Sequence, residues 1–206
     1  NLPIKKRLFM TATPRTVIGH YDKYVSMDDE LVYGDVFDEI TVKDAIEELG
    51  MLNDYKIITQ LIDNTYVESL LKENPFVYDK KKLPKETELK MIASALTLEK
   101  TIKRNKVKNI VSFHGAVKRA KAFQNGINNL LNKEINTYHV NGTQSGTHRK
   151  RILDNFSFSQ PSLVTNAQCL SEGVNVPSID AVIFVDPKQS RVSITQAVGR
   201  ALRKPI

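Results

Sequence analysis

The chain has 206 residues, 41% of them hydrophobic, with a formal net charge of +7 and an isoelectric point near 9.4. This length supports one sizeable core plus a smaller appendage, and the composition shows no bias toward disorder. The single cysteine, Cys169, excludes an internal disulfide, and no metal-site spacing of histidine and cysteine surrounds it. No apolar run predicts a membrane span or export signal, so we expect a cytoplasmic protein, and the basic charge favours a polyanionic partner.

The first fifty residues are weakly patterned. Residues 7–15, RLFMTATPR, predict a short strand that ends in small hydroxylic residues before Pro14. Residues 16–51 are mostly polar, with a short helix predicted over 42–48, and we interpret them as a connector. Because the sequence opens on a strand already under way and without methionine, we expect a fragment of a longer protein.

Residues 52–206 follow a different pattern. The segment 55–62, YKIITQLI, predicts a strand, and a helix is predicted over about 88–103. Further strands are predicted at 108–114, 135–142, 162–166 and 181–187, and helices at 116–131, 147–156 and 192–203. Strands that alternate with helices in this way predict right-handed βαβ units, and therefore an α/β fold with a parallel sheet covered on both faces.

Polar or small residues end several of these strands. They are Ser112 and His114, Thr165 and Asn166, and Asp186 and Pro187. Because ligands of open parallel sheets bind beyond the carboxyl ends of the strands, these residues predict a site at one edge of the sheet.

The last predicted helix carries Gln196, Arg200 and Arg203 at a spacing that would place them on one face. Apolar residues at 194, 198, 201 and 202 would dock its other face. Gly199 costs a helix roughly 1 kcal/mol relative to alanine, which indicates that something must approach the backbone closely. Arginine suits phosphate or carboxylate, whereas the alternative is a solvated basic helix end that complements the helix dipole.

Four segments resemble, in order and spacing, the motifs numbered III, IV, V and VI of superfamily 2 helicases. They are TATPR at 11–15, SFHGAVKRA at 112–120, LVTNAQCLSEGVNVPSIDAVIFVDP at 163–187 and QAVGRALRK at 196–204. Residues 32–52 are similar to the bridge between the lobes of restriction-type and phage-type members. The resemblance implies a RecA-like fold in which residues 1–15 hold the last strand of a first lobe, 16–51 connect the lobes and 52–206 form the second lobe.

The same resemblance implies an ATP site with Mg²⁺ between the lobes. Gln196 and Arg200 would face the terminal phosphates, Arg203 would act as an arginine finger, and Gly173 and Asn175 would approach the nucleotide. Such fingers are worth about 10³ to 10⁵ in rate in other phosphoryl-transfer enzymes.

A nucleic acid, with DNA favoured over RNA, is the implied partner. Thr165, His114 and Arg149 would contact its backbone, while Thr11 and Thr13 would couple the ATP state to lobe movement. Structural alternatives stay open for His114, as a histidine satisfied at a strand end, for Arg149, as a member of an ion pair, and for Thr11 and Thr13, as hydroxyls that cap a turn.

Two departures from the family pattern limit the expected activity. Asn175 stands where many relatives have aspartate, which weakens the expected contact with the ribose. The sequence also contains no GxxxxGK followed by Ser or Thr, and no Asp-Glu pair precedes TATPR to hold magnesium. We therefore expect this monomeric chain to be inactive alone and to need the first lobe.

Two other functions fit the sequence. A non-enzymatic, basic nucleic-acid-binding module on a RecA-like scaffold would bind nucleic acid in a salt-sensitive manner. A nucleotide-binding regulatory domain would bind ATP tightly without a partner lobe. The order of the motifs favours the helicase or translocase.

Overall fold

The computed structural model describes residues 6–17, 25–59, 61–73, 85–131, 134–167, 169–170 and 179–204. The chain divides into two compact units, Asn1–Gly50 and Met51–Ile206. Within the described residues, all strands and five of the seven helices belong to the second unit.

The first unit holds two short helices, α1 (Glu30–Tyr33) and α2 (Val42–Glu47). Thr41 and Asp44 form a reciprocal capping box at the start of α2, as the predicted helix over 42–48 requires. The strand expected over 7–15 is absent: residues 6–17 have no strand, and no other strand in the described part of this unit offers them a hydrogen-bond ladder. The division into 1–15 and 16–51 remains a prediction.

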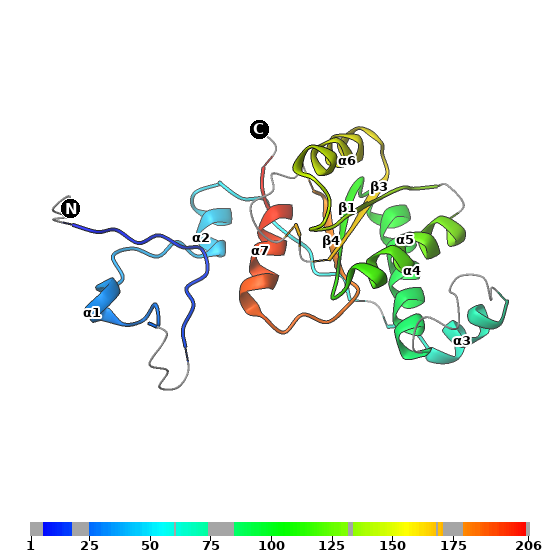
Figure 1. Ribbon diagram of the computed structural model, residues 1–206, viewed down its shortest axis with the longest axis horizontal. Helices are drawn as coiled ribbons and strands as arrows, with labels where there is room; N and C mark the ends of the chain where they lie inside the picture. The colour runs from blue at the N-terminus through cyan, green and yellow to red at the C-terminus, as the bar shows by residue number, and fades with distance from the viewer. Residues whose placement is uncertain are drawn as a thin grey trace. The chain divides into compact units, whose positions relative to one another are not determined.

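Four parallel strands form the sheet of the second unit: β1 (Asn109–His114), β2 (Asn136–Val140), β3 (Ser162–Ala167) and β4 (Ala181–Phe184). Their spatial order is β2-β3-β1-β4, and Figure 1 labels three of them, β1, β3 and β4. Ser112 of β1 lies opposite Thr165 of β3 and Ile183 of β4. The central strands β1 and β3 are buried throughout, as expected for a sheet that is covered on both faces.

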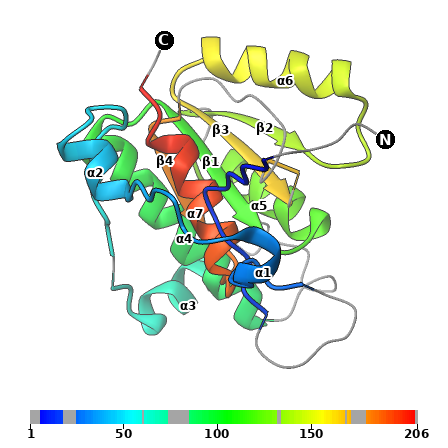
Figure 2. The ribbon, with the colours of Figure 1, turned by 90° about the vertical axis from the view of Figure 1, so that its left-hand side faces the viewer.

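Helices cover both faces of this sheet. They are α3 (Asn64–Glu73), α4 (Lys85–Asn105), α5 (Val117–Leu130), α6 (Gly146–Phe158) and α7 (Arg191–Ala201). Ile110 packs with α3, α4 and α5 in one core, whereas its neighbour Val111 packs with α6 and α7 in a second core. Adjacent strand residues point to opposite faces, so the two cores lie on either side of the sheet, with α5 and α6 across it from each other (Figure 2). The predicted three-layer α/β fold is confirmed.

The chain reverses its direction across the sheet after β2. The crossover from β1 to β2 passes over β3 and carries α5 on one face, and the return from β2 to β3 carries α6 on the other. Right-handed crossovers require this change of face whenever the direction reverses. The carboxyl ends of β1 and β3 are therefore neighbouring strand ends whose connections run in opposite directions.

In the second unit, one predicted element is wrong and one helix was not predicted. No strand forms over the described residues of 55–62, where most of the apolar side chains lie in solvent: Ile57 is 80% and Leu61 96% exposed. Helix α3 instead follows directly, with Val67 buried against α4. The predicted helix over 88–103 is found as the longer α4.

Candidate functional site

The carboxyl ends of β1 and β3 form the point in this sheet where strand connections diverge. In open α/β sheets, ligands bind in the crevice outside such a point. The residues at or just beyond these ends include His114, Gly115 and Asn166, and the starts of α5 and α6 lie at the same edge because each follows a strand end. The predicted edge is therefore where polar side chains gather.

His114 is buried at the end of β1 rather than exposed on the surface. Its side chain is 1% exposed and packs against Phe123 of α5, with ring centroids 5.1 Å apart. The Nε2 atom lies 3.0 Å from Ser112 Oγ, and Nδ1 has no hydrogen-bond partner among the described residues. Burial lowers the pKa of His114 to about 4, and the Asp186 carboxylate opposes this shift only in part. We conclude that His114 is neutral near pH 7.

This buried histidine should make the stability of the fold depend on pH. The unfolded side chain titrates near 6.5, so the unfolded state binds more protons than the folded state between about pH 6.5 and pH 4. The contribution of His114 should be fully present above pH 6.5, and the free energy of unfolding should fall by about 3 kcal/mol as the pH decreases to 4. Urea titrations at several pH values measure this change, and His114→Gln should flatten it; an equal pH dependence in the variant would contradict the assignment.

Thr165 is also buried, although the sequence predicts that Thr165 and His114 contact nucleic acid. The Thr165 hydroxyl donates to the Tyr138 carbonyl at 3.3 Å and lies 3.0 Å from His139 Nδ1. Asn141 in turn lies 3.2 Å from His139 Nε2. Both side chains face the α5 side of the sheet and have no more than 1% exposure, so neither lies at the surface in this structure. Their contact with nucleic acid stays a prediction.

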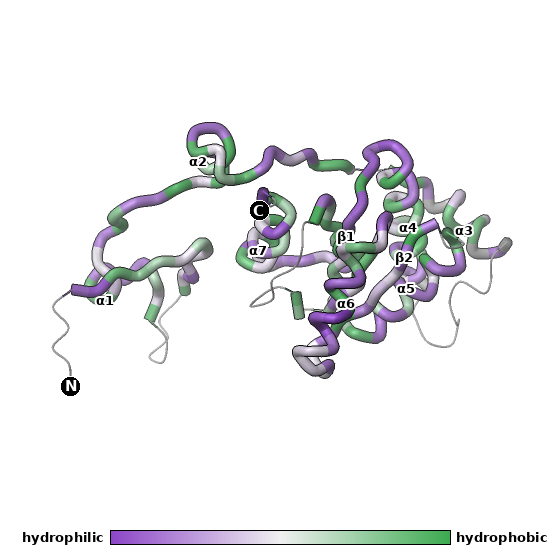
Figure 3. Tube along the Cα trace, turned by 90° about the horizontal axis from the view of Figure 1, so that it is seen from above, coloured by the Kyte–Doolittle hydropathy of each residue, from purple (hydrophilic) through white to green (hydrophobic). Residues whose placement is uncertain are grey.

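Basic side chains lie in the first two turns of α5 and α6. The exposed lysines and arginines among them are Lys118, Lys121, Lys150 and Arg151, and the stretch at the start of α6 is strongly hydrophilic (Figure 3). Neither helix has an acidic residue in its first turn. The amino end of a helix is positive, so an anion there would be stabilised by the helix as well as by these side chains. This arrangement favours phosphate binding at both helix starts.

Arg149, which lies near the start of α6, is half-buried close to Cys169. Burial raises the pKa of the Cys169 thiol, and the positive charge of Arg149 opposes that rise. The charge of Arg149 therefore acts on the segment that follows β3, where Cys169 lies. The predicted contact of Arg149 with nucleic acid stays a prediction.

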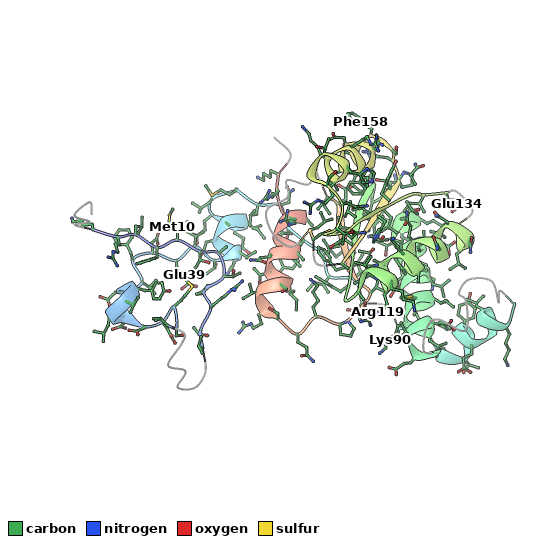
Figure 4. All side chains as sticks on the ribbon, in the orientation of Figure 1. Met10, Glu39, Lys90, Arg119, Glu134 and Phe158 are labelled. Carbon is green, nitrogen blue, oxygen red and sulfur yellow. The ribbon has the colours of Figure 1, made fainter. Side chains whose placement is uncertain are left out.

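Asp186, just beyond β4, ties the turn after β1 to α5. One carboxylate oxygen accepts a hydrogen bond from the Gly115 backbone N–H at 2.7 Å, and the other accepts one from Arg119 Nη1 at 3.0 Å. Figure 4 labels the Arg119 side chain on α5. A Cβ on Gly115 would lie 2.9 Å from the Arg119 guanidinium, so glycine makes room for this pair. Lys188 then places its ammonium 4.6 Å from the centre of the Phe113 ring. Sequence reasoning placed Asp186 at this edge but missed Arg119 and Lys188.

Helix α7 carries Gln196 and Arg200 but ends before Arg203. Leu202 caps the helix, and Arg203 forms an isolated antiparallel bridge with Leu52, so the predicted single row of three side chains is wrong. The two arginines nevertheless lie near each other. Burial lowers the pKa of Arg200, and the positive charge of Arg203 lowers it further.

The packing face of α7 also differs from the prediction. Ala197 is fully buried and Leu202 nearly so, whereas residues 194 and 198 are only half-buried. Beside Gly199, a Cβ would meet no side chain and no backbone outside its own helix within 4 Å among the described residues. The close approach that the sequence predicts at Gly199 stays a prediction.

Four other positions were predicted, two of them beyond the described residues and two in the first unit. Gly173 and Asn175 lie outside the described residues. In the first unit, the Thr11 hydroxyl accepts the Thr13 backbone N–H at 3.2 Å, which is the capped turn of the structural alternative. A coupling role for either threonine stays a prediction.

Residues 90–205, more than half of the chain, match the family described as the helicase conserved C-terminal domain. The chain belongs to this family. This helicase C-terminal domain is 28% identical over 204 residues to a protein of African swine fever virus named "Probable helicase A859L", covering 97% of this chain and 21% of that protein. It is 34% identical over 73 residues to the ATP-dependent RNA helicase DBP4 of Kluyveromyces lactis, covering 35% of this chain and 10% of that protein.

The fold of the helicase C-terminal domain is also found in a solved structure, the ATP-dependent type ISP restriction-modification enzyme LlaBIII bound to DNA. The TM-score is 0.71 at 24% identity, over 94% of this chain and 14% of that chain. These matches confirm the resemblance to superfamily 2 helicases and the RecA-like fold. The chain spans about a fifth of the length of the viral relatives it matches.

Two further findings concern the described residues. None of the described helices is long and apolar enough to cross a membrane. Among the described residues, no three or more His, Cys, Asp or Glu side chains group together in a way that could hold a metal ion.

Proposed function

We propose that this chain is the second RecA-like lobe of an ATP-dependent nucleic-acid helicase or translocase. ATP with Mg²⁺ would bind between this lobe and a first lobe, which would supply the phosphate-binding loop and the magnesium ligands. A protein in which this lobe is joined to such a first lobe is called the two-lobed protein below. On its own, the chain should not hydrolyse ATP.

The observation that carries this proposal is the pair of arginines at the end of α7 beside the open backbone of Gly199. The positive charge of Arg203 lowers the pKa of Arg200 beyond the effect of burial, and an anion bound between the two guanidinium groups would offset this repulsion. Triphosphate is the anion that the family membership suggests. Gln196 and Arg200 would face the terminal phosphates, and Arg203 would stabilise charge that develops during hydrolysis.

The starts of α5 and α6 support the nucleic-acid part of the proposal. Lysine, arginine and backbone N–H groups there can bind successive phosphates without reading bases, as a translocating enzyme requires. The likeness in fold does not distinguish DNA from RNA, and we propose DNA as the first partner to test.

A second candidate function is a non-enzymatic nucleic-acid-binding module, which the same basic helix starts would support. The two are separated by titrating the chain alone with ATP and, independently, with single-stranded DNA, and by assaying ATP hydrolysis in the two-lobed protein. The helicase proposal expects weak ATP binding by the chain and hydrolysis only when both lobes are present. Tight DNA binding by the chain, together with a two-lobed protein that does not hydrolyse ATP, would favour the binding module.

A further inference from the structure

Asn53 contacts the end of α7 from a position 150 residues earlier in the chain. Its backbone N–H donates to the Leu202 carbonyl at 2.8 Å. Its side-chain Nδ2 donates to the Arg203 carbonyl at 3.1 Å. The preceding residue, Leu52, completes the contact through its antiparallel bridge with Arg203. Two short segments that lie far apart in the sequence are thus paired at this point.

These bonds satisfy groups that a helix cannot satisfy by itself. The last carbonyls of an α-helix have no partner within the helix, and the final turn frays unless something caps it. Sequence-local caps use a residue just beyond the helix, often glycine. Here the distant Asn53 donates to the carbonyl of Leu202, the C-cap residue, and to the carbonyl of Arg203, one residue beyond the cap. The peptide groups on both sides of the Arg203 Cα are therefore held from the segment that opens the second unit.

An exposed arginine just beyond a helix depends on its backbone for orientation. Arg203 is exposed, and no ion pair of its side chain is found among the described residues. The contacts of its main chain are what fix the starting point and direction of the side chain. A shift of about 1 Å in a group that stabilises a transition state can cost a large factor in rate.

We infer that Asn53 is a positioning residue for Arg203: its two amide groups hold the end of α7 so that the guanidinium keeps its orientation for ATP hydrolysis. This inference rests on the proposed function, because it needs Arg203 to act on ATP. It adds a residue from the segment that opens the second unit to a site that otherwise comes from the helicase motifs.

The test is Asn53→Ala in the two-lobed protein, which removes the side-chain donor but keeps the backbone N–H. We expect kcat for ATP hydrolysis to fall about three- to tenfold, the size of one lost hydrogen bond, with KM for ATP within about twofold. Asn53→Gln keeps the amide and should recover part of the loss. Lys56→Ala, an exposed change on the same segment, is the matched control and should leave kcat unchanged.

A double-mutant cycle with Arg203→Ala separates positioning from a general loss of structure. If Asn53 acts through Arg203, Asn53→Ala should change kcat by less than about twofold once Arg203 is alanine. An equal loss in both backgrounds, or no loss in either, would overturn the inference while leaving the role of Arg203 intact. If Arg203→Ala itself leaves hydrolysis unchanged, the proposed function of Arg203 fails, and the inference fails with it.

Discussion

Replacing Arg203 with alanine in the two-lobed protein is expected to lower kcat for ATP hydrolysis by about 10³-fold or more. The physical reason is that a guanidinium placed against the terminal phosphate neutralises charge that grows as the bond to the leaving group breaks. Because this interaction strengthens in the transition state, kcat should fall much more than ATP affinity. Steady-state hydrolysis with saturating nucleic acid measures the effect.

Two matched variants show whether the effect is specific to this position. Arg191→Ala removes the same side chain from the first, exposed turn of α7 and should leave kcat nearly unchanged. Arg203→Lys keeps the charge but loses the planar fork of donors, so only a small part of the rate should return. Hydrolysis that survives Arg203→Ala would remove this arginine from the chemistry.

Replacing four cations at the starts of α5 and α6 with glutamine should weaken DNA binding by the chain at least about 10²-fold. The four are Lys118, Lys121, Lys150 and Arg151, all exposed. Each side chain should contribute one contact with a phosphate, and the positive end of the helix should strengthen that contact. The four substitutions together therefore remove the positive charge that would bind the phosphates. Equilibrium binding to a single-stranded oligonucleotide at fixed salt measures the change.

The opposite edge of the sheet offers a control with the same change in net charge. Lys100, Arg104, Lys106 and Lys108 are exposed cations near the end of α4, just before β1. Their replacement by glutamine removes an equal charge from the edge that carries the amino ends of the strands. We expect this control to weaken binding only by the smaller, long-range part of the electrostatic attraction.

Alternating strands and helices made the second unit predictable from the sequence. The apolar pairs at the centres of β1 (Ile110, Val111) and β3 (Leu163, Val164) and the helical spacing of α5 reflect burial against one sheet, and hydrophobic patterning detects such burial. The same patterning predicted a strand over residues 55–62 that does not form in the described part of this segment. Ile57 and Leu61 favour a strand by composition, but a strand also needs a neighbour, and sequence patterning does not show whether one is available.

The candidate site was predictable to the level of the sheet edge but not of individual contacts. The ends of the strands identify the edge, but they do not show that His114 and Thr165 face inward, toward α5. A polar side chain is buried when it finds a hydrogen-bond partner, and the partners here are Ser112 for His114 and His139 for Thr165. The contacts of Asn53 with the end of α7 also left no local signal. They join residues far apart in the sequence, and nothing in either segment alone predicts the pairing.

The salt dependence of DNA binding tests most directly the claim that this lobe binds phosphates at the carboxyl edge of its sheet. The slope of log affinity against log salt counts the phosphates that the protein neutralises, at about 0.7 per contact on a single strand. The account predicts that the α5 and α6 variant loses a slope of about 2 to 3, while the matched α4 variant keeps the slope of the unmodified chain. Equal losses in the two variants, or a larger loss in the α4 variant, would contradict it.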